Sequence, residues 1–166
     1  NVTGVQTCAL PISRSYAALM RNPAARILYI SVAIEGGFVF GSFPYFAPDM
    51  AARGIGGTAE AGLAVAAFGL GGLIYAATAK RLLGWFGQNR MILLGGGVCL
   101  AAYLGFAFAP RAWVFAASGV ALGVGMYMIH NSIQTRVTEV APQARGAAVA
   151  LHAFHFFLGQ TAGPLA

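Results

Sequence analysis

The stretch Met91–Ala109, "MILLGGGVCLAAYLGFAFA", contains no charged side chain over its whole length. At a rise of 1.5 Å per residue, a helix over this stretch is roughly 30 Å long, which matches the hydrocarbon core of a bilayer. The apolar residues form a continuous run and do not alternate with polar ones, as they would in the strand of a membrane barrel. The stretch therefore predicts a transmembrane helix.

Four further apolar runs of similar length lie on either side of it: Ile27–Ala47, Ala61–Ala79, Ala112–Ile133 and Gly146–Ala166. Only 8% of all residues are charged, against about 25% in soluble domains, and 58% are apolar. So few charged side chains cannot cover the surface of a soluble domain of this size. The sequence predicts an all-α membrane protein with five transmembrane helices, and Gly37-x-x-x-Gly41 and Gly119-x-x-x-Gly123 indicate close helix packing.

The Lys and Arg residues lie in the short connections, and they alternate in number from one connection to the next. Eight fall on one side of the predicted membrane and two on the other. Because cytoplasmic loops are rich in Lys and Arg, the N-terminus is expected in the cytoplasm of a bacterial inner (plasma) membrane protein. The cations are scattered, without a basic patch, so nucleic acid is not an expected partner.

Two stretches resemble the junction between the tenth and eleventh helices of major facilitator superfamily transporters. The first is "TRVTEVAPQARG" at residues 135–146, and the second is "GQTAGPL" at residues 159–165. The resemblance places five residues in the junction motif: Arg136, Glu139, Pro142, Arg145 and Gly146.

The segment between the second and third apolar runs resembles the cytoplasmic loop between helices eight and nine of the same family. Five residues match that loop motif: Lys80, Arg81, Gly84, Gly87 and Arg90. The acidic residue of the family motif is absent from this chain.

The resemblance covers residues 15–166 and implies that the five runs are helices seven to eleven of a twelve-helix bundle. It implies a secondary active transporter that works by alternating access, similar to the drug or sugar efflux group of proton antiporters. The expected partners are then the lipid bilayer, a small-molecule substrate, protons and the N-terminal half of the same transporter; no cofactor and no metal are expected. Residues 1–14 are interpreted as a non-native segment, because residues 1–12 resemble the translation of a sequencing-library adapter.

Glu35 is the carboxylate that interrupts the first apolar run. Ionisable groups at membrane depth are costly and by default indicate function. We therefore expect Glu35 to couple protons or to contact substrate. A structural carboxyl that is hydrogen-bonded to a helix backbone or to another helix is the alternative.

The remaining polar groups inside the apolar runs fall into two sets. Tyr127, His130, Asn131 and Gln134 share one helical face and predict a cavity wall, while His152, His155 and Gln160 are candidates for substrate or proton contact. Interhelical hydrogen bonding is the alternative for both sets. Two histidines at this spacing lack a third ligand, so a metal site is not predicted.

Two other functions stay open at this point: an intramembrane enzyme with a histidine-based site, and a small helical membrane protein that assembles from several chains. The sequence contains no G-x-S-x-G, H-E-x-x-H or phosphate-loop motif. An enzyme is therefore not predicted.

Overall fold

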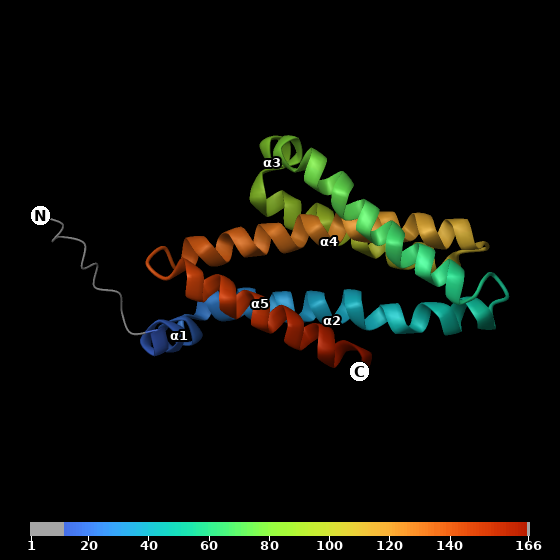
Figure 1. Ribbon diagram of the computed structural model, residues 1–166. Helices are drawn as coiled ribbons and strands as arrows, with labels where there is room; N and C mark the ends of the chain where they lie inside the picture. Colours follow the sequence, from blue (N-terminus) through green and yellow to red (C-terminus); the bar gives the residue numbers. More distant parts are fainter. Residues whose placement is uncertain (1–11, 166) are drawn as a thin grey trace, which may run out of the picture.

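The computed structural model describes residues 12–165, and these residues are almost entirely helical (Figure 1). The elements are α1 (Ile12–Arg21), α2 (Pro23–Ala52), α3 (Thr58–Phe108), α4 (Ala112–Val140), α5 (Arg145–Ala162) and the 3-10 turn η1 (Gly163–Leu165). Residues 12–165 contain no strand. The prediction of an all-α protein is confirmed.

α2 and α4 extend beyond the apolar runs that predicted them, whereas α5 ends at Ala162, short of its predicted run, and a 3-10 turn follows. α2 begins at Pro23 because the Asn22 side chain caps it, with Oδ1 accepting a hydrogen bond from the Ala24 backbone N–H at 3.0 Å. α4 likewise continues past Ile133 to Val140. An apolar run shows only which part of a helix can lie in the hydrocarbon core, whereas capping and helix-breaking residues determine where the helix ends. The predicted helices are therefore shorter than the observed ones where a helix ends in polar residues.

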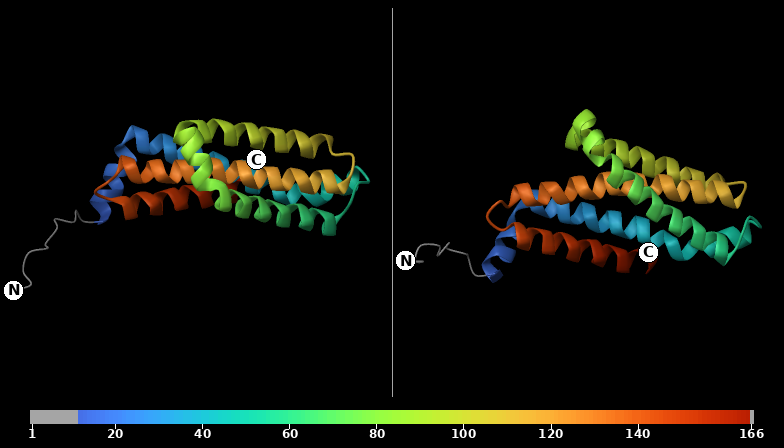
Figure 2. Two further views of the ribbon diagram at one scale, coloured as in Figure 1. Left: turned by 90° about the horizontal axis from the view of Figure 1, so that it is seen from above. Right: turned by 45° about the horizontal axis from the view of Figure 1, so that its top comes forward.

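Two of the predicted runs, 61–79 and 91–109, correspond to the two helical arms of α3, which form a hairpin, and the second arm ends at Phe108, one residue before the predicted end. The chain turns at Gly87, whose φ of 68° lies in the left-handed region that favours glycine. Residues 58–86 run parallel to α4, because Ala64 lies at Gly119 and Gly71 at Gly123. Residues 88–108 run antiparallel to α4, because Gly95 lies at Gly125 and Gly105 at Ser118. The two arms therefore run in opposite directions, as Figure 2 shows.

Within the described residues, three helices are long and apolar enough to cross a membrane: α2, α3 and α4. α5 has 18 residues and is not among them. Large apolar side chains also point outward, with Leu93 75% and Phe108 79% exposed. Outward apolar surface on long apolar helices is what an integral membrane protein presents to lipid.

Small residues bring α2 and α5 into close contact. A methyl group added to Gly159 would collide with the Ala33 carbonyl, and one added to Gly163 would collide with the Gly37 carbonyl. Such contacts are typical of membrane helices that pack through glycine. The predicted Gly37-x-x-x-Gly41 face is part of this interface, since a methyl on Gly41 would lie 2.7 Å from the Gly163 carbonyl carbon.

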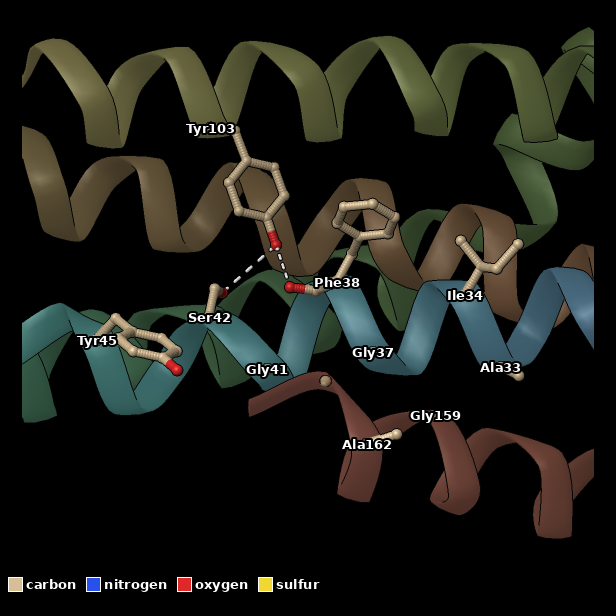
Figure 3. Close-up of a pocket in the computed structure, with 11 residues that line it drawn as sticks. Ala33, Ile34, Gly37, Phe38, Gly41, Ser42, Tyr45, Tyr103, Gly159 and Ala162 are labelled. Carbon is tan, nitrogen blue, oxygen red and sulfur yellow. Dashed lines mark hydrogen bonds between the residues drawn. The ribbon is translucent and has the colours of Figure 1, made fainter. Parts of the chain in front are cut away.

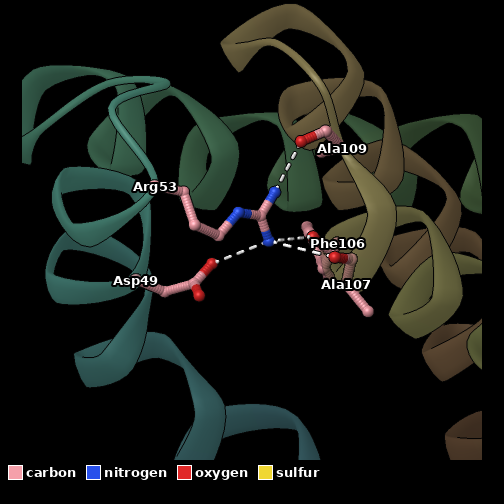
Figure 4. Close-up of polar contacts among 5 residues, drawn as sticks. All are labelled: Asp49, Arg53, Phe106, Ala107 and Ala109. Carbon is pink, nitrogen blue, oxygen red and sulfur yellow. Dashed lines mark hydrogen bonds and ion pairs between the residues drawn. The ribbon is translucent and has the colours of Figure 1, made fainter.

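Arg53 fastens the C-terminal end of α2 to the C-terminal end of α3 (Figure 4). Its guanidinium donates to the carbonyl oxygens of Phe106 at 2.8 Å and Ala109 at 2.6 Å, and pairs with Asp49 at 3.1 Å. The last carbonyls of a helix lack partners within the helix and carry the negative end of its dipole. Arg53 donates hydrogen bonds to these carbonyl oxygens and so holds the C-terminal ends of α2 and α3 together.

We expect Gly87→Ala to destabilise the protein by about 1 kcal/mol, because alanine pays a steric cost at positive φ. Gly84 lies in the helical part of the same turn region, and neither glycine has a neighbour that a methyl would meet. Gly84→Ala is therefore the matched control, expected to be neutral or stabilising. Thermal unfolding in detergent measures both variants, and equal melting temperatures would contradict the hairpin turn at Gly87.

Candidate functional site

Glu35 on α2 and His130 on α4 form a hydrogen-bonded pair of carboxyl and imidazole groups in the interior of the helical bundle. The His130 Nδ1 lies 3.1 Å from Glu35 Oε2, and the Glu35 residue is only 8% exposed. Neighbouring helices cover most of both side chains, leaving 6% of the Glu35 side chain and 17% of the His130 side chain exposed. A carboxylate and an imidazole in contact can hold and exchange a proton between them.

His152 on α5 extends this pair to a third helix. Its ring centroid lies 4.8 Å from that of His130, and the residue is 1% exposed. Two of the polar atoms here, Glu35 Oε1 and His152 Nε2, are buried and have no hydrogen-bond partner in the described part of the chain. We call these three residues the Glu35–His130–His152 cluster. The structure thus brings together three residues that the sequence identified on separate helices.

Glu35 also lines a groove of about 540 Å³ between α2, the second arm of α3, and α4. Most of its walls are apolar, for example Ile92 and Ile133, and Cys99 lies on the α3 side. Arg136 lines the same groove. We call this cavity the Glu35 groove. A largely apolar cavity of this size with a few polar groups has the form of a small-molecule site.

A second groove, of about 580 Å³, lies between α2, α5 and η1 (Figure 3). Tyr103 borders it, donating a hydrogen bond to the Phe38 carbonyl at 2.7 Å and lying 3.4 Å from the Ser42 hydroxyl. None of the described residues that line this groove is charged. Its polar side chains are hydroxyls and none is charged, whereas the Glu35 groove contains a carboxylate that can carry a proton, so the Glu35 groove is the candidate site.

The residues of the predicted polar stripe on α4 do not all face the same neighbouring helix. His130 faces Glu35, whereas Tyr127 packs against Gly72 and Tyr75 of α3, with Tyr75 ring to ring at 6.4 Å. Asn131 donates to the carbonyl of Tyr127 on its own helix at 3.0 Å. Gln134 is half-buried and makes no side-chain hydrogen bond with the rest of the described chain. Of the four residues, the structure therefore brings only His130 to Glu35.

On α5, the structure separates His155 and Gln160 from the cluster. His155 stacks on Tyr29, with ring centroids 5.0 Å apart, and its Nδ1 donates to the Leu151 carbonyl at 2.8 Å. These contacts fix His155 in a helix interface. Gln160 is half-buried, and its side chain makes no hydrogen bond with the residues that the structure describes.

The two motifs that resemble the family lie mostly on exposed helix ends next to the Gly87 turn and the α4–α5 turn. The loop residues Lys80, Arg81, Gly84 and Arg90 are exposed, and Gly87 forms the hairpin turn. At the junction between α4 and α5, the residues Glu139, Pro142, Arg145 and Gly146 are exposed. Arg136 differs from them because it lines the Glu35 groove.

The junction motif was the only sequence feature that indicated Arg136, and it did not predict that Arg136 lines the groove. Helical periodicity carried the necessary signal, since Met126, Ile129, Ile133 and Arg136 lie on one face of α4 and all line the groove. Among the residues that the structure describes, no group of three or more His, Cys, Asp or Glu could hold a metal ion.

Long apolar helices with outward apolar side chains, packed around a buried carboxylate and histidine, have the features of an integral membrane protein. Comparison with known proteins gives the family. The Major Facilitator Superfamily profile matches residues 9–164, so the chain belongs to this superfamily and the resemblance found in the sequence is confirmed. Membership points to a transporter rather than an enzyme.

The chain is similar to an uncharacterized MFS-type transporter, YfkF, of Bacillus subtilis (strain 168), with 33% identity over 79 residues. The aligned residues make up 47% of this chain and 20% of that transporter, so the chain spans only part of the relative's length. No solved structure matches the chain. The interpretation of residues 1–14 as non-native falls largely outside the described residues, which begin at Ile12.

Proposed function

We propose that the chain forms part of a secondary active transporter that exports a small amphipathic molecule in exchange for protons. The Glu35–His130 pair supports this proposal most directly, because a charge-changing group inside the bundle is what proton coupling requires. In this proposal the substrate binds at the Glu35 groove. The helices of this chain and the other half of the transporter then move relative to one another around the bound substrate, which gives alternating access.

We also propose that the chain crosses the membrane five times, as helices seven to eleven of a twelve-helix protein. The 51 residues of α3 would reach roughly 76 Å if straight, more than twice a hydrocarbon core. Its two antiparallel arms fit two crossings, and α5 supplies the fifth. The excess of Lys and Arg then places the N-terminus, Arg90 and the α4–α5 turn in the cytoplasm of a bacterial inner membrane.

This topology predicts opposite labelling of two exposed positions. In a cysteine-free background, Arg111→Cys is expected to react with a membrane-impermeant maleimide added to intact cells, and Arg90→Cys only after permeabilisation. Both side chains are exposed in the structure, so access depends on the side of the membrane. Labelling of position 90 in intact cells, with protection of position 111, would reverse the proposed orientation.

Transport itself is tested in inverted vesicles from cells that produce the complete gene product. The probes are ethidium, as an amphipathic drug, and radiolabelled glucose, as a sugar. With an acidic vesicle interior, one of the two is expected to accumulate above the level of vesicles without the protein, and nigericin is expected to release it. Accumulation of neither probe would overturn the drug-or-sugar assignment, and accumulation that nigericin leaves unchanged would overturn proton coupling.

A further inference from the structure

The closest helix contacts divide the described bundle into two pairs, α2 with α5 and α3 with α4 (Figure 1). A methyl group added to Gly159 on α5 would collide with the backbone of α2, and one added to Gly123 on α4 would collide with the backbone of α3. With η1 counted as part of α5, every glycine in residues 12–165 whose added methyl would collide with the backbone of another helix makes that contact inside one pair. Backbone packed on backbone leaves no side chain that could adjust, so each pair is expected to behave as one rigid body.

The contacts between the two pairs are made by side chains. Phe46 on α2 packs against Phe106 on α3 with ring centroids 4.7 Å apart, and His130 on α4 packs against Phe156 on α5 at 4.8 Å. Such side chains can change rotamer and slide past one another, as in the shear movements of packed helices. The boundary between the pairs is therefore the surface along which this part of the protein moves most easily.

One end of this boundary is fastened on the side where α2 meets the second arm of α3. Arg53 binds the last carbonyls of α3 there, as Figure 4 shows, and the short α2–α3 connection lies at the same end. Nearer the middle, the Tyr103 hydroxyl donates to the Phe38 carbonyl at 2.7 Å. Toward the other end, the Glu35 groove separates α2 from the second arm of α3. On this side, the two pairs are thus held at one end and free to part at the other.

We propose that α2 and α5 move as one rigid body against α3 and α4, turning about the Arg53 end and changing the width of the Glu35 groove at the other end. The Glu35–His130 hydrogen bond crosses the boundary between the pairs, so this movement makes or breaks it. The movement does not require that Glu35 couple protons, so this proposal and the proposed function can fail separately.

The end of the bundle opposite Arg53 contains one terminus of every helix that takes part. α4 and α5 meet there at their turn, and the second arm of α3 begins beside the end of α4 because the two run antiparallel. The start of α2 lies beside that of α5, where the Tyr29 hydroxyl donates to the Ala148 carbonyl at 3.5 Å. Four exposed residues near this end can therefore report the movement: Arg26 and Arg145 in one pair, and Arg90 and Glu139 in the other.

Distances between spin labels in the complete gene product, in phosphatidylcholine nanodiscs without substrate or gradient, test the proposal. Two labelled cysteines at a time are introduced into a cysteine-free background and measured by double electron–electron resonance. We expect the distance distribution of Arg26→Cys with Arg90→Cys, across the boundary, to be broader by at least about 2 Å than those within the pairs, Arg26→Cys with Arg145→Cys and Arg90→Cys with Glu139→Cys. Within-pair distributions as broad as the one across the boundary would overturn the rigid pairs.

Arg53→Gln tests whether Arg53 holds the fixed end. Labels at Ala51→Cys and Arg111→Cys, both exposed, measure the distance across the boundary at that end. We expect Arg53→Gln to shift or broaden this distance by about 2 Å and to leave the within-pair distances unchanged, which also shows that each pair stays folded. Arg90→Gln removes the same charge from the opposite end and is the matched control. No change in Arg53→Gln, or an equal change in Arg90→Gln, would overturn the role of Arg53.

Discussion

Glu35→Gln in the complete gene product is expected to abolish gradient-driven transport while leaving substrate exchange across the membrane largely intact. Glutamine keeps the size of the side chain and its hydrogen bonding to His130, and it removes only the proton that the carboxyl can gain and lose. A transporter whose coupling group no longer changes charge can still move substrate in both directions, but it cannot use a proton gradient. The measurement compares nigericin-sensitive accumulation with counterflow in the same vesicles.

Two further variants isolate the effect. Glu139→Gln removes a carboxylate from an exposed position on α4 and is expected to leave both activities unchanged. Glu35→Ala leaves His130 without its buried partner and is expected to reduce folded protein as well as transport. If Glu35→Gln accumulates the probe as the unchanged protein does, Glu35 has a structural role and proton coupling at this residue is wrong.

Gly123→Val is expected to destabilise the protein by about 3 kcal/mol, at the upper end of typical overpacking costs. Gly123 on α4 faces Gly71 on the first arm of α3, and a methyl added there would collide with the Phe68 carbonyl and lie 3.1 Å from the Gly71 Cα. The obstacle is backbone, which no rotamer change can move, so the two helices must separate. Loss of the folded protein peak in gel filtration and a lower melting temperature measure the effect.

Gly69→Val is the matched control, since Gly69 lies on the exposed face of the same arm and has no neighbour within 4 Å of an added Cβ. We expect a change of no more than about 0.5 kcal/mol there, as for other exposed substitutions. Similar melting temperatures for the two variants would show that α3 and α4 do not pack through these glycines.

The sequence predicted the helical class and the approximate place of each apolar run, because bilayer thickness sets a length that composition reveals. It did not predict that helix reaches both sides of Gly87, with residues 58–86 and 88–108 helical and only Gly87 departing from helical geometry. Nothing in the pattern distinguishes Gly84 from Gly87, and the left-handed conformation appears only at Gly87. The ends of α2 and α4 extend beyond the runs because Asn22 and the polar last turns of α4 are compatible with helix outside apolar sequence.

The candidate site was only partly predictable. Glu35, His130 and His152 each stand out as polar groups in apolar runs, so each could be selected alone. Their contact depends on which helices are neighbours and on how each helix is rotated about its axis. Neither can be deduced from a single sequence. The same rotation sends Tyr127 and Asn131 toward α3 and brings Arg136 into the groove. Similar reasoning explains why His155 looked equivalent to His152 but stacks on Tyr29 instead.

If Glu35 couples protons to transport, its carboxyl gains and loses a proton inside the protein. Infrared difference spectroscopy of the complete gene product in liposomes, between alkaline and acidic buffer, observes this event without a substrate. We expect a carboxylic acid C=O band on acidification that shifts in deuterated water, is absent from Glu35→Gln and persists in Glu139→Gln. The same band in Glu35→Gln as in the unchanged protein would contradict the account.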